Sequence, residues 1–314
     1  MGSYVIRRLL SLIPAMLLVS VLAFLFMHLI PGNPAAVRLG PSATTEQIER
    51  MTEKMGLNKP IYVQFELWFS HVMQGDLGES IFFQQSVLSV IGSRAETSIL
   101  LATLGMLVVI CVGLPLGVIS AVRRNTWIDQ VSLTVSFLGA GIPDFWLGLL
   151  LMLVFAVILG WFPTSGFTSI FAKGGITNLR YLILPALTLG IPNAALLTRL
   201  VRSSMLDVLS LDYISTAKAK GLPERTVVLK HALRNCAIPI ITTIAFTLVI
   251  LMAQAVVTES VFALPGIGRL VISSVLRRDY PVLQGVLLLT AFLYLFVNLL
   301  ADVAYGLLDP RIRY

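Results

Sequence analysis

Six long apolar runs constrain this chain more than any other feature of its sequence. A helix needs about 20 mostly apolar residues to cross a bilayer, because only a helix or a closed barrel pairs every backbone polar group in lipid. Barrel strands would instead alternate over segments of about ten residues. The runs predict an all-α integral membrane protein with about six transmembrane helices, the third long enough to contain a break. They are Leu9–Ile30, Ser98–Val122, Val131–Phe162, Tyr181–Val201, Leu233–Val257 and Val282–Leu308.

The composition excludes a soluble fold. Hydrophobic residues make up 57% and charged residues 12% of the chain, against about 45–50% and about 25% in soluble domains. A soluble protein with so few charges would expose a large apolar surface and aggregate. The first run follows Arg7 and Arg8, as a signal peptide would, but it is long and has no small-residue cleavage site before Pro31. We therefore expect it to stay in place as a span.

The net charge of +7 is explained by topology. If the N-terminus is cytoplasmic, the inner segments carry a net +8, the outer segments +1, and Asp144 and Asp302 lie within spans. Lys and Arg concentrate on the cytoplasmic side of membrane proteins. The pattern predicts two cytoplasmic termini with residues 31–97 outside, and it removes the reason to expect nucleic-acid binding.

No motif for a metal, a disulfide or a nucleotide is present in the sequence. Cys111 and Cys236 are far apart, and the histidines His28, His71 and His231 show no helical pairing. No Walker-type loop, nucleophile elbow or dinucleotide fingerprint occurs. We therefore expect no catalytic residue, no metal and no cofactor in this chain, with energy supplied by another subunit or by a gradient.

The outer segment is the longest polar stretch. Thr44 is placed to cap a helix that ends near Gly56, and a second short helix is expected after Pro60. The second helix has an amphipathic aromatic face, which we expect to lie on the membrane or on the rest of the fold rather than to bind a ligand. That face comprises Tyr62, Phe65, Leu67 and Trp68.

The inner segment from Leu200 to Leu233 is too polar to span a membrane. Asp212 is predicted to cap a helix over Tyr213–Lys220, Gly221 is a suitable left-handed stop, and Pro223 would open a second helix over Glu224–Ala232. The predicted structure is a helix, a glycine turn and a helix.

One face of the first of these helices is expected to present Ala217, Ala219 and Gly221, whose small size permits close approach, with Lys218 and Lys220 beside them. A compact element of this kind is suited to docking against another protein. The alternative is a basic hairpin that rests on anionic lipid.

The same segment resembles the coupling loop of binding-protein-dependent ABC importer permeases, which has Glu-Ala-Ala, three residues and then Gly. The aligned residues here are Ser215-Thr216-Ala217, Lys218-Ala219-Lys220 and Gly221. The glutamate is absent, and Ile238-Pro239 lies further on, as in the dipeptide/oligopeptide/nickel branch. Other segments similar to that branch follow in order along the chain: Pro31-Gly32-Asn33-Pro34-Ala35, Gly56-Leu57-Asn58-Lys59-Pro60, Gly75-Asp76-Leu77-Gly78-Glu79-Ser80, Pro143-Asp144-Phe145-Trp146, Phe262-Ala263-Leu264-Pro265-Gly266-Ile267-Gly268-Arg269-Leu270, Arg278-Asp279-Tyr280-Pro281 and Asp309-Pro310-Arg311-Ile312-Arg313.

The resemblance implies a permease subunit of a type I ABC importer in a bacterial inner membrane. Residues 1–96 would hold the first span and a periplasmic segment, residues 97–308 the core permease domain with a coupling loop at about 204–232, and residues 309–314 a cytoplasmic tail. Partners would be a homologous second permease, two ATPases that bind ATP and Mg²⁺, and a substrate-binding protein. The residues expected to contact an ATPase are Asp212, Tyr213, Ala217, Lys218, Ala219, Lys220, Gly221 and Leu222.

Near relatives in this branch carry dipeptides, oligopeptides, glutathione or chelated nickel, and the sequence does not choose among them. The runner-up interpretation is a gradient-driven carrier or channel without ATPases, but no internal repeat is evident and such a carrier has no use for the hairpin. An intramembrane enzyme would need a polar catalytic set that Asp144 alone does not supply.

Polar residues in two spans are candidates for lining the translocation pathway. Four of them fall within about 60° of one another on the fifth span, at 100° per residue. The alternative is that they bond the preceding turn or a neighbouring helix. These four residues, which form a polar stripe, are Thr243, Thr247, Gln254 and Thr258.

The other candidate is Asp144, which follows Pro143 in the third span. Its carboxylate should face the bundle interior, water or a partner; the alternative is that it caps a helix locally.

Overall fold

The structure, a computed structural model, describes residues 2–29, 33–40, 42–172 and 174–308. Pro31 and Gly32, which open the first of the family-like motifs, and the motif that starts at Asp309 lie outside these residues. The described part of the chain is built from helices and loops, with no strand. It divides into two compact units, of which unit 1 comprises Met1–Glu96 and Arg269–Leu299 and unit 2 comprises Thr97–Gly268 and the residues from Leu300 on.

The predicted number of spans is confirmed. Among the described residues, five segments are long and apolar enough to cross a membrane, and a bent pair of helices makes a sixth if it is counted as one span. The unbroken segments are α1 (Gly2–Leu29), the continuous helix formed by α5 (Val87–Val108), η1 (Val109–Gly113) and α6 (Leu114–Val122), then α9 (Arg180–Leu209), α13 (Ala237–Val261) and α15 (Tyr280–Leu308).

The third span contains the expected break. α7 (Trp127–Gly141) is followed by Ile142 and Pro143 in extended conformation, and then by α8 (Asp144–Leu151) and η2 (Met152–Ile158). The two halves are bent by 104°. Proline lacks the N–H that would continue the helix and disfavours the helical conformation for the residue before it. Ile142-Pro143 therefore forms an elbow, and Asp144 begins the helix beyond it.

Several boundaries differ from those read from hydropathy. The second helix begins at Val87 rather than Ser98 and includes Arg94 and Glu96, because a helix can continue past the apolar segment. α9 continues to Leu209 for the same reason. An additional amphipathic helix, α14 (Ile267–Arg277), lies between the fifth and sixth spans. Its eleven residues are too few to span a bilayer, so the apolar runs gave no sign of it.

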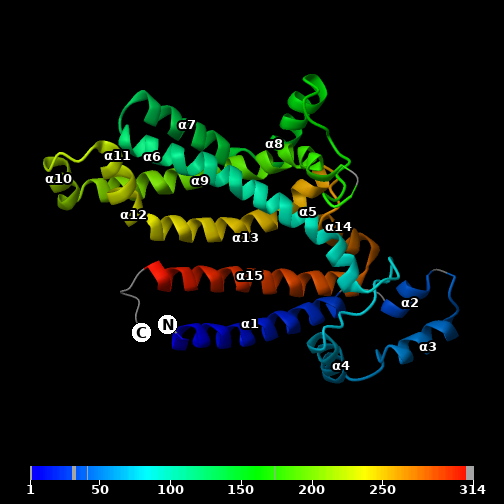
Figure 1. The fold of residues 1–314 in the computed structure, drawn as a ribbon. Coiled ribbons are helices and arrows are strands. Elements are labelled where there is room, and N and C mark those ends of the chain that lie inside the picture. Colours follow the sequence, from blue (N-terminus) through cyan, green and yellow to red (C-terminus); the bar gives the residue numbers. More distant parts are fainter. Residues whose placement is uncertain (1, 30–32, 41, 173, 309–314) are drawn as a thin grey trace. The chain divides into compact units, whose positions relative to one another are not determined.

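Unit 2 is built around α9, the most buried of the spans. α6, α7, α8 and α13 all contact it (Figure 1). The α6 contact is close because it is made by glycine: a Cβ added to Gly117 would lie 2.6 Å from the Val201 Cβ and 2.8 Å from the Thr198 carbonyl oxygen. Small residues at such contacts let two backbones approach in a membrane, where dispersion rather than the hydrophobic effect drives association.

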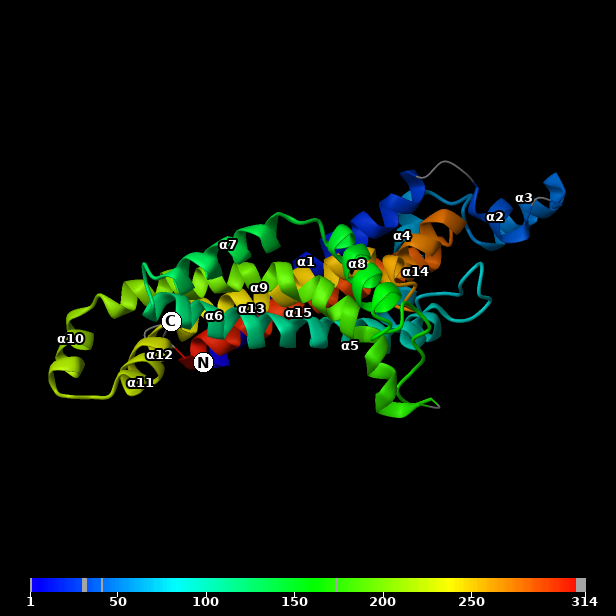
Figure 2. The same cartoon turned by 90° about the horizontal axis from the view of Figure 1, so that it is seen from above.

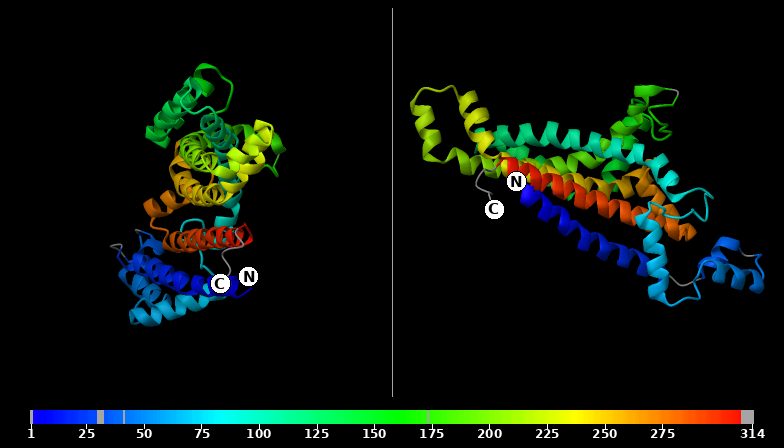
Figure 3. Two further views of the ribbon diagram at one scale, coloured as in Figure 1. Left: turned by 90° about the vertical axis from the view of Figure 1, so that its left-hand side faces the viewer. Right: turned by 60° about the horizontal axis from the view of Figure 1, so that its bottom comes forward.

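Unit 1 contains α1, α15 and three short helices of the outer segment, α2 (Pro34–Leu39), α3 (Thr45–Lys54) and α4 (Ile61–Met73). The predicted cap at Thr44 is confirmed as a capping box with Gln47, and Gly56, at φ +67°, follows the end of α3. α1 lies beside α15, and the amide nitrogen of Gln284 donates to the Ala23 carbonyl oxygen at 3.3 Å (Figure 3).

The aromatic face of α4 packs in part on the fold, as expected. The rings of Phe65 and Trp68 lie 5.4 and 5.6 Å from the Phe24 ring of α1, between ring centroids. Tyr62, by contrast, is 70% exposed. The contact fixes α4 across one end of α1.

Asp279 connects two segments of unit 1 that are far apart in sequence. Its carboxylate accepts hydrogen bonds from the Ser80 hydroxyl at 2.5 Å and from the backbone N–H groups of Ile81 and Phe82 at 3.1 and 3.3 Å. The guanidinium of Arg277 lies 3.6 Å from the centre of the Phe82 ring. Since Ser80 and Asp279 are both buried, this carboxylate holds the loop before α5 against the start of α15.

We expect Asp279→Ala to lower the free energy of unfolding by about 2–3 kcal/mol, because it leaves a buried hydroxyl and two N–H groups without an acceptor. Thermal unfolding of the purified protein in detergent measures the change. Glu79→Ala is the control, because the Arg38–Glu79 pair is exposed, with side chains 41% and 67% accessible, and should contribute less than about 1 kcal/mol. Equal effects of the two variants would contradict the assignment.

Candidate functional site

A hairpin of short helices connects α9 to α13. It consists of α10 (Asp212–Ala219), a turn at Gly221, α11 (Glu224–Thr226), η4 (Val227–Ala232) and α12 (Leu233–Asn235). Figure 2 shows it extending beyond the ends of α9 and α13. The predicted helix–turn–helix is confirmed, and Gly221 has the expected left-handed backbone, with φ +76°. A hairpin that extends past the spans is accessible to a partner.

Asp212 does not cap α10. The cap position is Leu211, in extended conformation, and Asp212 is the first helical residue. The prediction placed the helix one residue late, because the Ser210-Leu211 bend gives no sign in the sequence. The carboxylate of Asp212 still lies in the first turn, where it interacts favourably with the helix dipole.

The small residues of α10 do not share one face, so that prediction is wrong. Residues two apart on a helix point about 200° apart. Ala217 is buried together with Ile214, in the same core cluster as Val227 and Val228 of η4, whereas Ala219 is exposed. The surface open to a partner consists instead of Asp212, Tyr213, Ser215, Thr216, Lys218, Ala219, Lys220, Gly221 and Leu222.

The hairpin is tied internally. The side-chain amide of Asn235 donates to the Tyr213 hydroxyl at 2.8 Å and to the His231 carbonyl oxygen at 2.7 Å. At its base, the Cys236 thiol contacts the Ser204 carbonyl oxygen of α9 at 3.3 Å. With Ile214 buried in the core that continues into α9, these bonds make the hairpin a stiff extension of unit 2 rather than a flexible loop.

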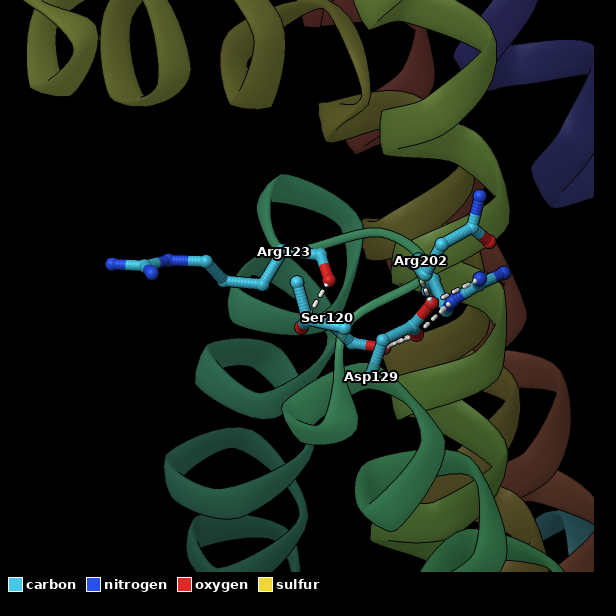
Figure 4. Close-up of polar contacts among 6 residues, drawn as sticks. Ser120, Arg123, Asp129 and Arg202 are labelled. Atoms are coloured by element: carbon cyan, nitrogen blue, oxygen red, sulfur yellow. Dashed lines mark hydrogen bonds and ion pairs between the residues drawn. The ribbon is translucent and has the colours of Figure 1, made fainter.

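An ion pair with a buried carboxylate lies near the end of α9 that leads into the hairpin, and it was not predicted from the sequence. Asp129 of α7 accepts two hydrogen bonds from Arg202 of α9, from Nε to Oδ1 at 2.7 Å and from Nη2 to Oδ2 at 2.8 Å. The Ser120 hydroxyl of α6, at 2.5 Å, and the Asn125 backbone N–H, at 2.9 Å, complete the site. Figure 4 shows Ser120, Asp129 and Arg202 converging while the Arg123 side chain points away.

The sequence contained a sign of this pair: an acid and an arginine, each within one turn of the polar inner end of a span. Charge counting placed both residues in inner segments and did not pair them. Only the packing of α7 on α9 brings them together, with Asp129 2% exposed.

The candidate pathway residues of α13 lie in different environments. Thr247 and Thr258 are buried in unit 2, and the Thr258 hydroxyl has no partner among the described residues. The Thr243 hydroxyl donates to the Pro239 carbonyl oxygen at 3.0 Å. The Gln254 side chain accepts a 2.8 Å bond from the amide of Asn193 on α9. Of the four residues, Gln254 is thus held against α9, while Thr247 and Thr258 are closed off from solvent in this conformation.

Asp144 lies at the elbow of the third span, as the first residue of α8, and is partly exposed.

A further acid, Glu259 of α13, is fully buried. Its carboxylate accepts a hydrogen bond from the Ser98 hydroxyl of α5 at 2.5 Å, and the Ser98 hydroxyl in turn accepts one from the Ile267 N–H at 2.8 Å. A Cβ at Gly266 would clash with the Glu259 carboxylate. This explains why the Pro265-Gly266-Ile267 motif has glycine there.

Within the described ranges, no three residues among the histidines, cysteines and acids are grouped so that they could hold a metal ion.

Two family models cover the chain. Residues 1–102 match the N-terminal model of the binding-protein-dependent transport system membrane component, and residues 113–314 match the binding-protein-dependent transport system inner membrane component. The chain belongs to this family of ABC permeases. It is therefore a non-catalytic, multi-pass permease subunit of the inner membrane, which works with an ATPase and a substrate-binding protein.

Curated relatives are similar over their full lengths. The chain is 43% identical over 314 residues to the "Probable peptide ABC transporter permease protein y4tP" of Sinorhizobium fredii, with 100% of both chains covered. It is 44% identical over 314 residues, again with 100% of both covered, to the glutathione transport system permease protein GsiC of Escherichia coli K12. These matches leave no place for a carrier or channel that works without ATPases.

Solved structures support the fold. A chain of the methionine ABC transporter MetNI in an inward-facing conformation matches with a TM-score of 0.59 and 17% identity, over 71% of this chain and 97% of that chain. The predicted type I importer permease fold is confirmed.

We expect Arg202→Met to destabilise the permease by about 3–5 kcal/mol, because it leaves the Asp129 carboxylate buried without its ionic partner. The melting temperature of the purified subunit in detergent reports this change. Arg123→Met removes a nearby charge whose side chain makes no contact with the cluster and should leave that temperature unchanged. If both variants melt with the wild type, the pair contributes nothing to the stability of unit 2.

Proposed function

We propose that this permease forms half of the pathway of an ATP-driven importer of peptides, in the size range of dipeptides, oligopeptides or glutathione. Full-length similarity to permeases named for peptide and glutathione transport supports this substrate class over chelated nickel. A homologous second permease would supply the other half of the pathway, and a binding protein would deliver the cargo.

The hairpin is the proposed contact with the ATPase. The observation that carries this proposal is a hairpin, tied by hydrogen bonds and buried contacts, that extends past α9 and α13 and exposes Tyr213, Lys218 and Leu222. Two ATPase subunits would bind ATP and Mg²⁺, and this chain would hold no cofactor. Closure of the ATPases on ATP would shift the hairpin and, through α9 and α13, open the pathway outward.

The pathway would be lined by Asp144 at the elbow and by the polar stripe of α13. Asp144, Thr243 and Gln254 are partly accessible, whereas Thr247 and Thr258 are buried against the rest of unit 2. The two buried threonines would reach the pathway only when α13 moves relative to α9. We therefore propose that the stripe is exposed in part of the transport cycle.

We expect Gly221→Val to reduce substrate uptake at least tenfold while ATP hydrolysis continues. Nothing lies within 4 Å of a Cβ at this position, so the change acts through the backbone: φ +76° strains a branched residue by about 1–3 kcal/mol and redirects α11. Uptake and ATP hydrolysis are measured together in proteoliposomes of the complete transporter.

Gly221→Asn is the matched control, because asparagine tolerates the left-handed conformation and should retain most of the uptake. Full ATP-driven uptake by the valine variant would contradict the coupling role. A hairpin that merely rests on lipid would give that result.

The proposed orientation places both termini in the cytoplasm and α3 outside. The concentration of Lys and Arg in the hairpin and in the α6–α7 turn supports it. In a background without Cys111 and Cys236, a cysteine at Glu49 should react with an impermeant thiol reagent added to intact spheroplasts. A cysteine at Arg225 should react only after permeabilisation, and its labelling in sealed spheroplasts would reverse the topology.

A further inference from the structure

The Asp129–Arg202 pair joins α7 to the helix that carries the hairpin. Arg202 lies about two turns before the end of α9 at Leu209, where the chain enters the hairpin. We propose that this pair is the mechanical joint through which movement of the hairpin reaches α7 and the elbow of the third span. Both residues act by positioning α7, and the proposal rests on the coupling role of the hairpin.

The geometry of the pair fixes both the distance and the relative orientation of the two side chains. The guanidinium of Arg202 meets both carboxylate oxygens of Asp129, and such a bidentate contact fixes orientation as well as distance. The Ser120 hydroxyl and the Asn125 N–H occupy remaining acceptor positions of the same carboxylate. α6, the α6–α7 turn, α7 and α9 therefore meet at one buried group.

Nearer the elbow, α7 and α9 make a cation–π contact, with the Arg199 guanidinium 5.3 Å from the centre of the Phe137 ring, and otherwise pack, within the described residues, without directional bonds. A Cβ at Gly139 would lie 3.6 Å from the Ala195 Cβ and 3.8 Å from the Ile191 Cγ2, which is ordinary van der Waals contact. Packed helices can slide by small amounts over such non-directional contacts. A bidentate ion pair resists that sliding, so a shift of α9 carries α7 with it.

The C-terminal end of α7 connects this joint to the elbow of the third span. α7 is a continuous helix of 15 residues from Trp127 to Gly141, and it ends at the Ile142-Pro143 elbow. A shift applied at Asp129 therefore reaches the elbow and Asp144 beyond it. The joint would connect the ATPase-facing hairpin to a candidate pathway residue without passing through α13.

Stability alone does not require an ion pair here. Replacing both members of a buried pair by neutral groups of similar volume is often neutral for stability, whereas removing one member is costly. Apolar residues could hold α7 on α9. What the pair adds is a fixed register between the two helices.

The test uses the double variant Asp129→Asn/Arg202→Met, which leaves no unpaired charge and retains an acceptor for Ser120 or Asn125. In proteoliposomes of the complete transporter we expect assembly and ATP hydrolysis within twofold of wild type, and at least a tenfold fall in substrate imported per ATP. Arg123→Met is the control and should behave as wild type. An unchanged ratio of uptake to hydrolysis in the double variant would overturn the proposal.

A distance measurement separates a joint from a merely structural pair. Spin labels at the exposed residues Gln130 of α7 and Ser203 of α9, in a background without native cysteines, report their separation by electron paramagnetic resonance. We expect one narrow distance with and without ATP in the wild type, and a broadened or ATP-dependent distance in the double variant. Identical narrow distances in both proteins would also overturn the proposal.

Failure of the proposed Asp129–Arg202 joint can be distinguished from failure of the proposed coupling role of the hairpin. Gly221→Val perturbs the hairpin and leaves the ion pair intact. If Gly221→Val uncouples transport and Asp129→Asn/Arg202→Met does not, the hairpin couples and the joint is wrong. If neither variant uncouples, both assignments are wrong.

Discussion

The close packing of α9 in unit 2 is the constraint on which the rest of this unit depends. A membrane gives apolar helices no hydrophobic reason to associate, so close approach must come from small residues and internal hydrogen bonds. Gly117 permits that approach from α6, and the Thr198 hydroxyl donates to the Gly113 carbonyl oxygen at 3.2 Å. Because α9 also carries Arg202 and leads into the hairpin, the same packing positions the buried ion pair and the proposed ATPase contact.

The sequence determined those features that depend on local chemistry. Apolar length predicted the spans and the break in the third, and Gly221 predicted the left-handed turn. Features that depend on how the helices pack could not be predicted from the sequence. The burial of Ala217 rather than Ala219 depends on which face of α10 meets η4, and the pairing of Asp129 with Arg202 depends on α7 lying on α9. α14 was missed because it is too short to register as a span.

The two polar nodes of unit 2 have different consequences. Glu259 and Ser98 fix the C-terminal part of α13 to α5 and the start of α14, and a glycine at 266 leaves room for that carboxylate. Asp129 and Arg202 fix α7 to the C-terminal part of α9. α9 and α13 pack against each other, and within that contact Asn193 donates a neutral hydrogen bond of 2.8 Å to Gln254. A neutral hydrogen bond of this kind is weaker than the charged contacts at either node.

The central claim is that the exposed face of α10 contacts an ATPase rather than lipid. Photo-crosslinking from a probe at Ala219, in membranes that hold the complete transporter, tests it most directly. A probe at Leu138, 64% exposed on α7, serves as the comparison and should capture lipid. We expect a protein adduct between this permease and the ATPase from Ala219, with a yield that changes when ATP is added. Capture of phospholipid alone from Ala219 would contradict it.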